Sequence, residues 1–149
     1  MIPVTVSDAL LDQLTEQAKA SPRLRMNYDL RNSQEDGSQR MLNAIEPGSP
    51  LPIHRHKYTS ETVVCLRGRL VWEYYQEVQG SRFTVQGVQE PKAELVEEIE
   101  LSPNGQVVAL NIPAGQWHTV RALESGSVIL EMKDGTYEPL REEDVLELK

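Results

Sequence analysis

The stretch GSPLPIHRHKYTSETVVCLRG, residues 48–68, carries two of the three histidines of the chain and a glutamate close behind them. On a β-strand, side chains two residues apart point to the same face, so His54 and His56 can approach one ligand together. Glu61 follows five residues after His56, an odd offset that would aim it at the opposite face of one continuous strand. The polar residues 57–60 between them offer a turn that returns Glu61 to the same side. The stretch therefore predicts two imidazoles and one carboxylate clustered inside a β-structure.

A second short stretch, PAGQWH at residues 113–118, carries the remaining histidine. Pro113 and Gly115 suit the second and fourth positions of a type I turn, which would start a strand with His118 facing inward. A single histidine is more often a surface or packed residue than a ligand, but here every histidine falls in one of these two stretches. Three neutral imidazoles and one carboxylate suit a borderline divalent cation, and an octahedral ion would keep two positions open. We expect one divalent ion, with Zn, Ni, Fe and Mn all open, bound by His54, His56, Glu61 and His118.

From about residue 40 the chain reads as many short strands, because apolar or β-branched residues recur in brief runs bounded by turn residues. The runs lie at 41–45, 62–66, 69–75, 82–85, 94–101, 106–112, 117–123 and 127–133. No helical segment alternates with them, which argues against a parallel α/β sheet. The pattern predicts an all-β fold, a small jelly-roll-like barrel over about 40–133.

An amphipathic helix is expected before the barrel, over residues 7–19. Ser7 can cap it, Leu10, Leu11 and Leu14 recur at helical spacing, and Ser21-Pro22 ends it. We expect this helix, within a lead-in of 1–22, to pack on the outside of the barrel. Residues 86–92 read as a loop, and 134–149 as a C-terminal tail with one helical turn and a solvated acidic run. A length of 149 residues fits a single domain, 1–149.

Composition excludes several classes of function. The formal net charge is −8 and no basic stripe is present, so neither nucleic acid nor an anionic membrane surface is an expected partner. One cysteine, Cys65, permits no disulfide within the chain. The N-terminus lacks a basic segment followed by a long apolar run, so a cytoplasmic location is the default expectation.

The two histidine stretches resemble the cupin motifs. Gly48, His54-x-His56, Glu61 and Gly68 match the first motif throughout, and Pro113-x-Gly115-x-x-His118 resembles the core of the second. The segments 39–56, 60–68, 112–119 and 128–140 are more specifically similar to the WbuC family of cupin-fold metalloproteins. This resemblance implies a cupin barrel, a metal site and a context of surface-polysaccharide biosynthesis, with no settled reaction. Small cupins often pair through sheets, so we also expect a homodimer.

Four further residues are candidates for a substrate pocket, while the catalytic residues stay unknown. Arg40 can hold an anion by a forked contact or form an ion pair at the surface, and Asn43 can face the interior. Tyr58 can offer a hydroxyl at the pocket mouth or lie exposed in its turn. Glu131 shares one face of a late strand with Lys133. If that face is interior the carboxylate needs a partner, and if it is exterior both are solvated.

Three functions fit these observations. The first is a metalloenzyme acting on a small polar metabolite, a sugar or a sugar-derived compound, by isomerisation or epimerisation. The second is an iron-dependent dioxygenase, since the ligand set does not fix the metal. The third is a non-catalytic module that binds a small molecule or a metal, because the fold alone does not imply activity.

Overall fold

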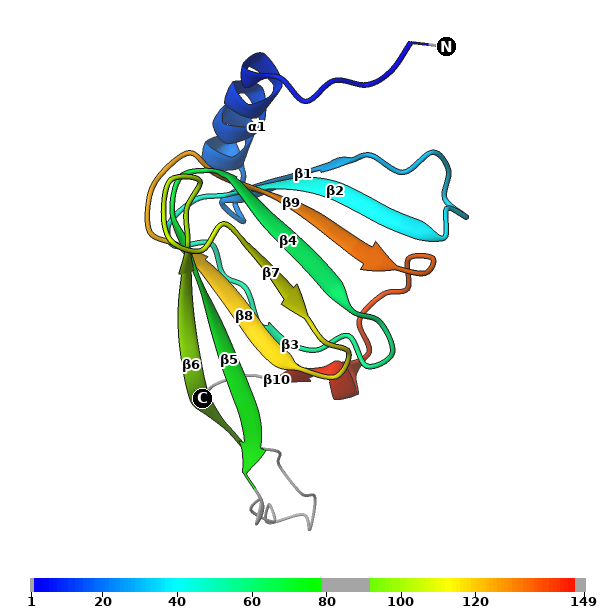
Figure 1. Cartoon of the computed structure of the whole chain (residues 1–149), viewed down its shortest axis with the longest axis vertical. Coiled ribbons are helices and arrows are strands. Elements are labelled where there is room, and N and C mark those ends of the chain that lie inside the picture. The colour runs from blue at the N-terminus through cyan, green and yellow to red at the C-terminus, as the bar shows by residue number, and fades with distance from the viewer. Residues whose placement is uncertain (1, 79–91, 147–149) are drawn as a thin grey trace.

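The computed structural model describes residues 2–78 and 92–146. Two five-stranded antiparallel sheets face each other, and a single α-helix covers the outside of one of them (Figure 1). The predicted all-β jelly roll with an N-terminal helix is therefore confirmed. The expected strand at 82–85 and most of the expected loop at 86–92 lie outside the described residues.

The first sheet has the strand order β1-β2-β9-β4-β7, and the second has the order β10-β3-β8-β5-β6. The strands of the first are β1 (Arg25–Asp29), β2 (Ser38–Ile45), β9 (Ser127–Asp134), β4 (Glu61–Arg67) and β7 (Ala109–Ile112). Those of the second are β10 (Val145–Leu146), β3 (Ile53–His54), β8 (Trp117–Ala122), β5 (Leu70–Val78) and β6 (Lys92–Leu101). The two sheets thus extend beyond 40–133 at both ends, through β1 and β10.

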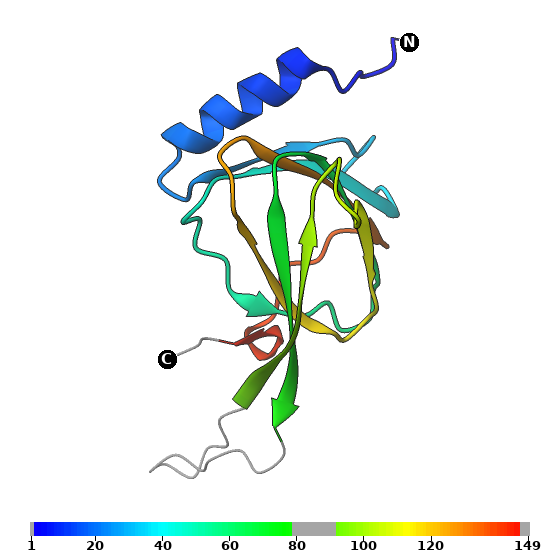
Figure 2. The ribbon, with the colours of Figure 1, turned by 60° about the vertical axis from the view of Figure 1, so that its left-hand side comes forward.

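Helix α1 (Asp8–Ala20) forms where the sequence predicts it. The Ser7 hydroxyl accepts a hydrogen bond from the Leu10 amide, which satisfies one of the free N–H groups of the first turn. Leu11, Leu14 and Ala18 are buried against β1, β2 and β9, and the helix lies on the face turned away from the second sheet (Figure 2). Burying one leucine in this way contributes about 2 kcal/mol.

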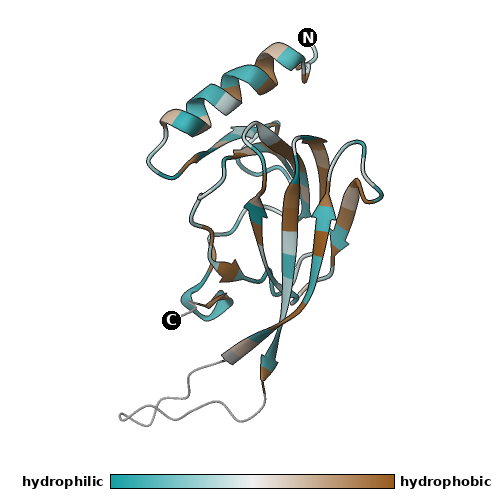
Figure 3. Ribbon diagram, turned by 90° about the vertical axis from the view of Figure 1, so that its left-hand side faces the viewer, coloured by the Kyte–Doolittle hydropathy of each residue, from teal (hydrophilic) through white to brown (hydrophobic). Residues whose placement is uncertain are grey.

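Hydrophobic and hydrophilic residues alternate along several strands (Figure 3), and the buried apolar side chains form one layer under α1 and another between the sheets. On β2, Leu42 and Ala44 point outward to α1, whereas Ile45 points between the sheets. The layer between the sheets is made of side chains from both, namely Ile45, Val63, Cys65, Leu70, Trp72, Leu101, Ile112, Val120, Ala122 and Ile129. Cys65 is thus a packed core residue, and burial raises the pKa of its thiol to about 11.

The C-terminal segment departs from the expected solvated tail. A 3₁₀ turn, η1 (Glu142–Asp144), leads into β10, which pairs with β3 so that Val145 stands opposite His54. Asp144 is buried, and its carboxylate accepts a hydrogen bond from Arg55 Nε at 2.9 Å. The helical turn is confirmed, but the acidic run is only partly solvated because Asp144 is buried against Arg55.

Across the described part of the chain, no helix is long and apolar enough to cross a membrane.

The close approach of Gly68 to Ser127 gives a test of the barrel. Gly68 has φ +77°, and a Cβ there would lie 2.6 Å from Ser127 Cα, whereas a Cβ at Gly126, φ +85°, would meet open space. We expect Gly68→Ala to lower the free energy of unfolding by about 3 kcal/mol and Gly126→Ala by about 1 kcal/mol, since only the first adds a clash to backbone strain. Chemical denaturation measures both, and equal losses would contradict the close approach.

The expected homodimer stays a prediction. Strand β6 is ten residues long, pairs on one side with β5, and exposes Leu95 and Val96. An open edge of that length favours pairing with another chain. Light scattering over a range of concentrations tests this expectation, and a monomeric mass throughout would contradict it.

Candidate metal centre

The three histidines converge at one end of the jelly roll. His54 on β3 stands directly opposite His118 on β8, and their ring centroids lie 4.4 Å apart. His56 lies just beyond the end of β3, with its ring centroid 5.1 Å from that of His54. One ring nitrogen from each imidazole can be chosen so that all three lie within 4.8 Å of one another. The convergence predicted from the two stretches is thus present, although β3 itself is only two residues long.

Backbone carbonyls orient two of the rings. His54 Nδ1 lies 3.1 Å from the Pro52 carbonyl oxygen, and His118 Nδ1 lies 2.8 Å from that of Gln116. A carbonyl oxygen only accepts hydrogen bonds, so each Nδ1 carries the hydrogen and each Nε2 keeps its lone pair. Metal-binding histidines are commonly fixed in this way by a hydrogen bond from the other nitrogen.

Both of these imidazoles are held neutral. Burial and, to a smaller extent, the charge of His118 lower the pKa of His54 to about 4. Burial is also the main cause that lowers the pKa of His118. Near pH 7 the two Nε2 lone pairs are therefore free of protons and available to a cation.

Glu61 opens β4 and is buried beside the histidines. Its Oε2 lies 3.3 Å from His56 Nε2 and 3.7 Å from His118 Nε2, yet it makes no well-formed hydrogen bond among the described residues. Burial alone would raise the pKa of Glu61, but His56, His118 and Lys133 outweigh it and hold the pKa below its ordinary value. A buried carboxylate oxygen facing imidazole nitrogens is costly unless a cation lies between them or a ring N–H, such as that of His56, donates to it. The donor set therefore fits one divalent metal ion.

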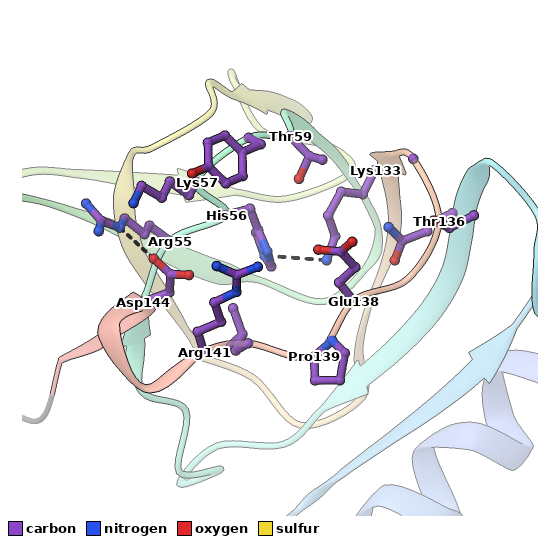
Figure 4. A pocket seen from close by; sticks show the side chains of 14 residues that line it. Arg55, His56, Lys57, Thr59, Lys133, Thr136, Glu138, Pro139, Arg141 and Asp144 are labelled. Atoms are coloured by element: carbon purple, nitrogen blue, oxygen red, sulfur yellow. Dashed lines mark hydrogen bonds and ion pairs between the residues drawn. The ribbon is translucent and has the colours of Figure 1, made fainter.

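A pocket of about 280 Å³ opens onto this cluster at His56 (Figure 4). Its walls come from the segment 55–59, from β9 and its continuation, and from the C-terminal segment. The lining residues that carry charge are Arg55, Lys57, Lys133, Glu138, Arg141 and Asp144.

The four candidate pocket residues lie in three different parts of the structure. Tyr58 lines the pocket and is 77% exposed, so it lies at the mouth. Asn43 and Glu131 lie together in the interior, with Asn43 Nδ2 3.5 Å from Glu131 Oε1. Arg40 lies away from the site. Like Leu42, it points to the outer face of β2, and its guanidinium binds the Asp36 carboxylate at 2.9 Å.

Several pocket residues were not among the sequence candidates. Lys133 turns out to be interior, since its Nζ lies 3.5 Å from His56 Nε2, and its shared parity with Glu131 was the available signal. Arg141 and Asp144 reach the pocket only because β10 pairs with β3. No local pattern in the sequence points to that pairing.

The environment of Glu131 gives a pH test. Burial, then the charge of Glu61, raises its pKa to about 7 from 4.5, while Lys133 and Asn43 oppose the rise. A raised carboxyl pKa contributes stability below pH 4.5 that is lost as the pH rises through about 7. Replacing Glu131 by Gln removes that dependence. In metal-free protein, the unfolding free energy of Glu131→Gln relative to wild type should therefore rise by about 2–3 kcal/mol between those two pH values.

Denaturant unfolding at several pH values measures this difference. The exposed Glu16→Gln serves as the matched control and should show a flat difference. A flat difference for Glu131→Gln as well would contradict the buried position of that carboxyl group.

Comparison with known proteins places the fold and the family. The structure is similar to capsular polysaccharide assembling protein CapF from Staphylococcus aureus, with a TM-score of 0.59 and 20% identity over 86% of this chain and 33% of CapF. It is also similar to KdgF from Halomonas sp., with a TM-score of 0.53 and 16% identity over 78% of this chain and 84% of that one. A recombinant oxalate oxidase in complex with glycolate gives a TM-score of 0.52 and 12% identity over 82% of this chain and 56% of that one.

These likenesses show a cupin fold and nothing finer, and the chain spans only about a third of the length of CapF. No curated protein sequence matches the chain. The family described as a domain of unknown function, DUF6016, matches residues 6–84, a segment that includes His54, His56 and Glu61. That match covers more than half of the 149 residues, so this cupin-fold chain belongs to the DUF6016 family.

Proposed function

We propose that the protein is a metal-dependent enzyme acting on a small polar metabolite, with one divalent ion held by His54, His56, Glu61 and His118. The observation that carries the proposal is the buried Glu61 oxygen, which faces two imidazoles without a hydrogen-bond partner among the described residues. A purely structural cluster would be expected to satisfy that oxygen. A pocket beside it supplies room for a substrate.

The bound ion would supply a Lewis acid that polarises a carbonyl or hydroxyl oxygen of the substrate. The chain's own residues then bind and orient the substrate and hold protons. Lys133 lines the pocket beside His56, so its ammonium can donate hydrogen bonds to a substrate oxygen. Glu131 lies two residues before Lys133 on β9, and in metal-free protein burial raises the pKa of this carboxyl to about 7, which makes it the candidate for holding a proton.

Isomerisation or epimerisation of a sugar-derived compound is the reaction class that we favour. Such reactions need a polarised oxygen and a group that moves a proton, and the proposed ion and Glu131 would supply them at this end of the barrel. The resemblance to WbuC proteins supports a substrate from surface-polysaccharide biosynthesis. CapF is itself described as a capsular polysaccharide assembling protein, although its likeness to this chain extends to the fold alone.

Metal content of purified protein is the first test. Wild-type protein should carry about one equivalent of a divalent ion, and His56→Ala and His118→Ala should each bind it at least about 100-fold more weakly, because a lost ligand costs more than a lost outer-sphere contact. Lys19→Ala, an exposed substitution on α1, is the control and should keep full occupancy. Circular dichroism checks that the variants stay folded.

Full metal occupancy in both histidine variants would overturn the site. Oxygen consumption during turnover, together with iron as the bound element, would replace the isomerase proposal by a dioxygenase. Tight metal binding without turnover of any sugar would leave a binding module.

A further inference from the structure

The pocket in front of the metal centre is positively charged, in contrast to the rest of the molecule. The chain as a whole has a formal charge of −8, with 23 acidic and 15 basic residues. The pocket lining reverses this balance, with four basic side chains against two acidic ones. Charge of one sign in a concave site raises the local concentration of ligands of the opposite sign.

Two of these charged side chains, Arg55 and Asp144, form an ion pair with each other. Arg55 Nε bonds the Asp144 carboxylate at 2.9 Å, and the guanidinium lies 4.6 Å from the centre of the Trp117 ring. This pair is structural, since it fastens η1 to the segment that follows β3. The charges left to face a ligand are those of Lys57, Lys133 and Arg141, opposed by Glu138. Arg141 also lies 3.8 Å from Glu143, but both side chains of that pair are exposed, so it holds the guanidinium only weakly.

Lys133 is the best placed of them. Its backbone stands opposite that of Glu61 in the pairing of β9 with β4, and its Nζ lies 3.5 Å from His56 Nε2. In the described part of the chain Lys133 makes no ion pair with a carboxylate. His56 Nε2, which now faces the ammonium, is also the atom that we expect to face the ion.

An ammonium group and a divalent cation at the same imidazole repel each other. A negatively charged ligand lying between them removes that repulsion and gains charge-assisted hydrogen bonds from the lysine. The Arg141 guanidinium is directed toward the same space from the opposite wall (Figure 4). Its planar fork suits carboxylate and phosphate oxygens.

We propose that this pocket binds a polyhydroxylated anion of about the size of a monosaccharide, a sugar acid or a sugar phosphate. Lys133 and Arg141 hold the carboxylate or phosphate group beside the metal centre. Glu138, Thr136 and Thr59 also line the pocket and offer acceptors and hydroxyls to the sugar hydroxyl groups. The inference rests on the proposed function for the nature of the substrate, but the anion contacts belong to side chains that metal-free protein also has.

The test is an NMR titration of metal-free and metal-loaded protein, followed at the amides of Gly135 and Thr136. Glucuronate and glucose form a pair of similar size that differs in charge, while inorganic phosphate and acetate separate the two kinds of anion. We expect glucuronate to bind at least about tenfold more tightly than glucose, with an affinity that falls as the salt concentration rises. Stronger perturbation by phosphate than by acetate would assign a sugar phosphate, and the reverse order a sugar acid.

Substitutions at Lys133 and Arg141 test whether these side chains bind the anion. Lys133→Gln should weaken binding of the anions about tenfold or more, and Arg141→Gln several-fold, as expected for loss of a charge-assisted hydrogen bond. Lys19→Gln makes the same change of charge on α1 and should leave the affinity unchanged. Arg141 is largely exposed, so its variant tests the pocket even if Lys133→Gln lowers stability.

Two results would overturn the proposal: equal affinity for glucose and glucuronate, or anion binding that neither pocket variant weakens. Metal stoichiometry measured on the same samples separates the two ideas. Normal metal loading without a preference for anions removes this inference and leaves the proposed function. Anion binding without any metal loading removes the proposed function and leaves this inference.

Discussion

The pairing of His54 with His118 is the contact on which the rest of the site depends. Strand β3 is only two residues long and is held between β8 on one side and β10 on the other. That position fixes where the chain turns away toward His56 and Glu61. Because β8 pairs with β5 over six residue pairs, the short strand β3 lies beside a firmly held strand. A metal centre gains from such support, since ligands on paired strands lose little freedom when the ion binds.

Burial of polar groups at this end of the barrel follows from the same arrangement. Glu61, Glu131 and Lys133 all point between the sheets, below or beside the histidines, where ordinary core positions hold Val63 and Ile129. Each would be costly there alone. Together they form a set in which a positive lysine, one ionised carboxylate and one carboxyl that is easily protonated offset each other. An arrangement of this kind lowers stability relative to an apolar core and is therefore expected at a functional site.

The sequence allowed the jelly roll, the capped helix and the convergence of the three histidines to be predicted, because each depends on local spacing. The i, i+2 pair and the two turns fix side-chain directions over a few residues. Local spacing left two roles open for Arg40, because the parity of β2 depends on which face α1 covers, and the structure places this side chain in an ion pair with Asp36. Strand β10 and the roles of Arg141 and Asp144 had no local signal, because Asp144 meets Arg55 across 89 residues of sequence.

The site is built from two parts of the chain. The segment that matches the family, residues 6–84, holds three of the four proposed ligands, whereas His118 and the wall formed by 135–144 lie outside it. The wall packs on the barrel mainly through the Arg55–Asp144 pair and the short strand β10, with few apolar side chains committed to the core. Changes there can alter the charge and shape of the pocket at small cost to stability. The histidine cluster lies deeper, and a substitution there would disturb β3, β4 and β8 at once. If the ion and the anion bind as proposed, chemistry and substrate choice are separable in this fold, because the proposed metal ligands lie on or beside strands of the sheets and the pocket wall belongs to the C-terminal segment.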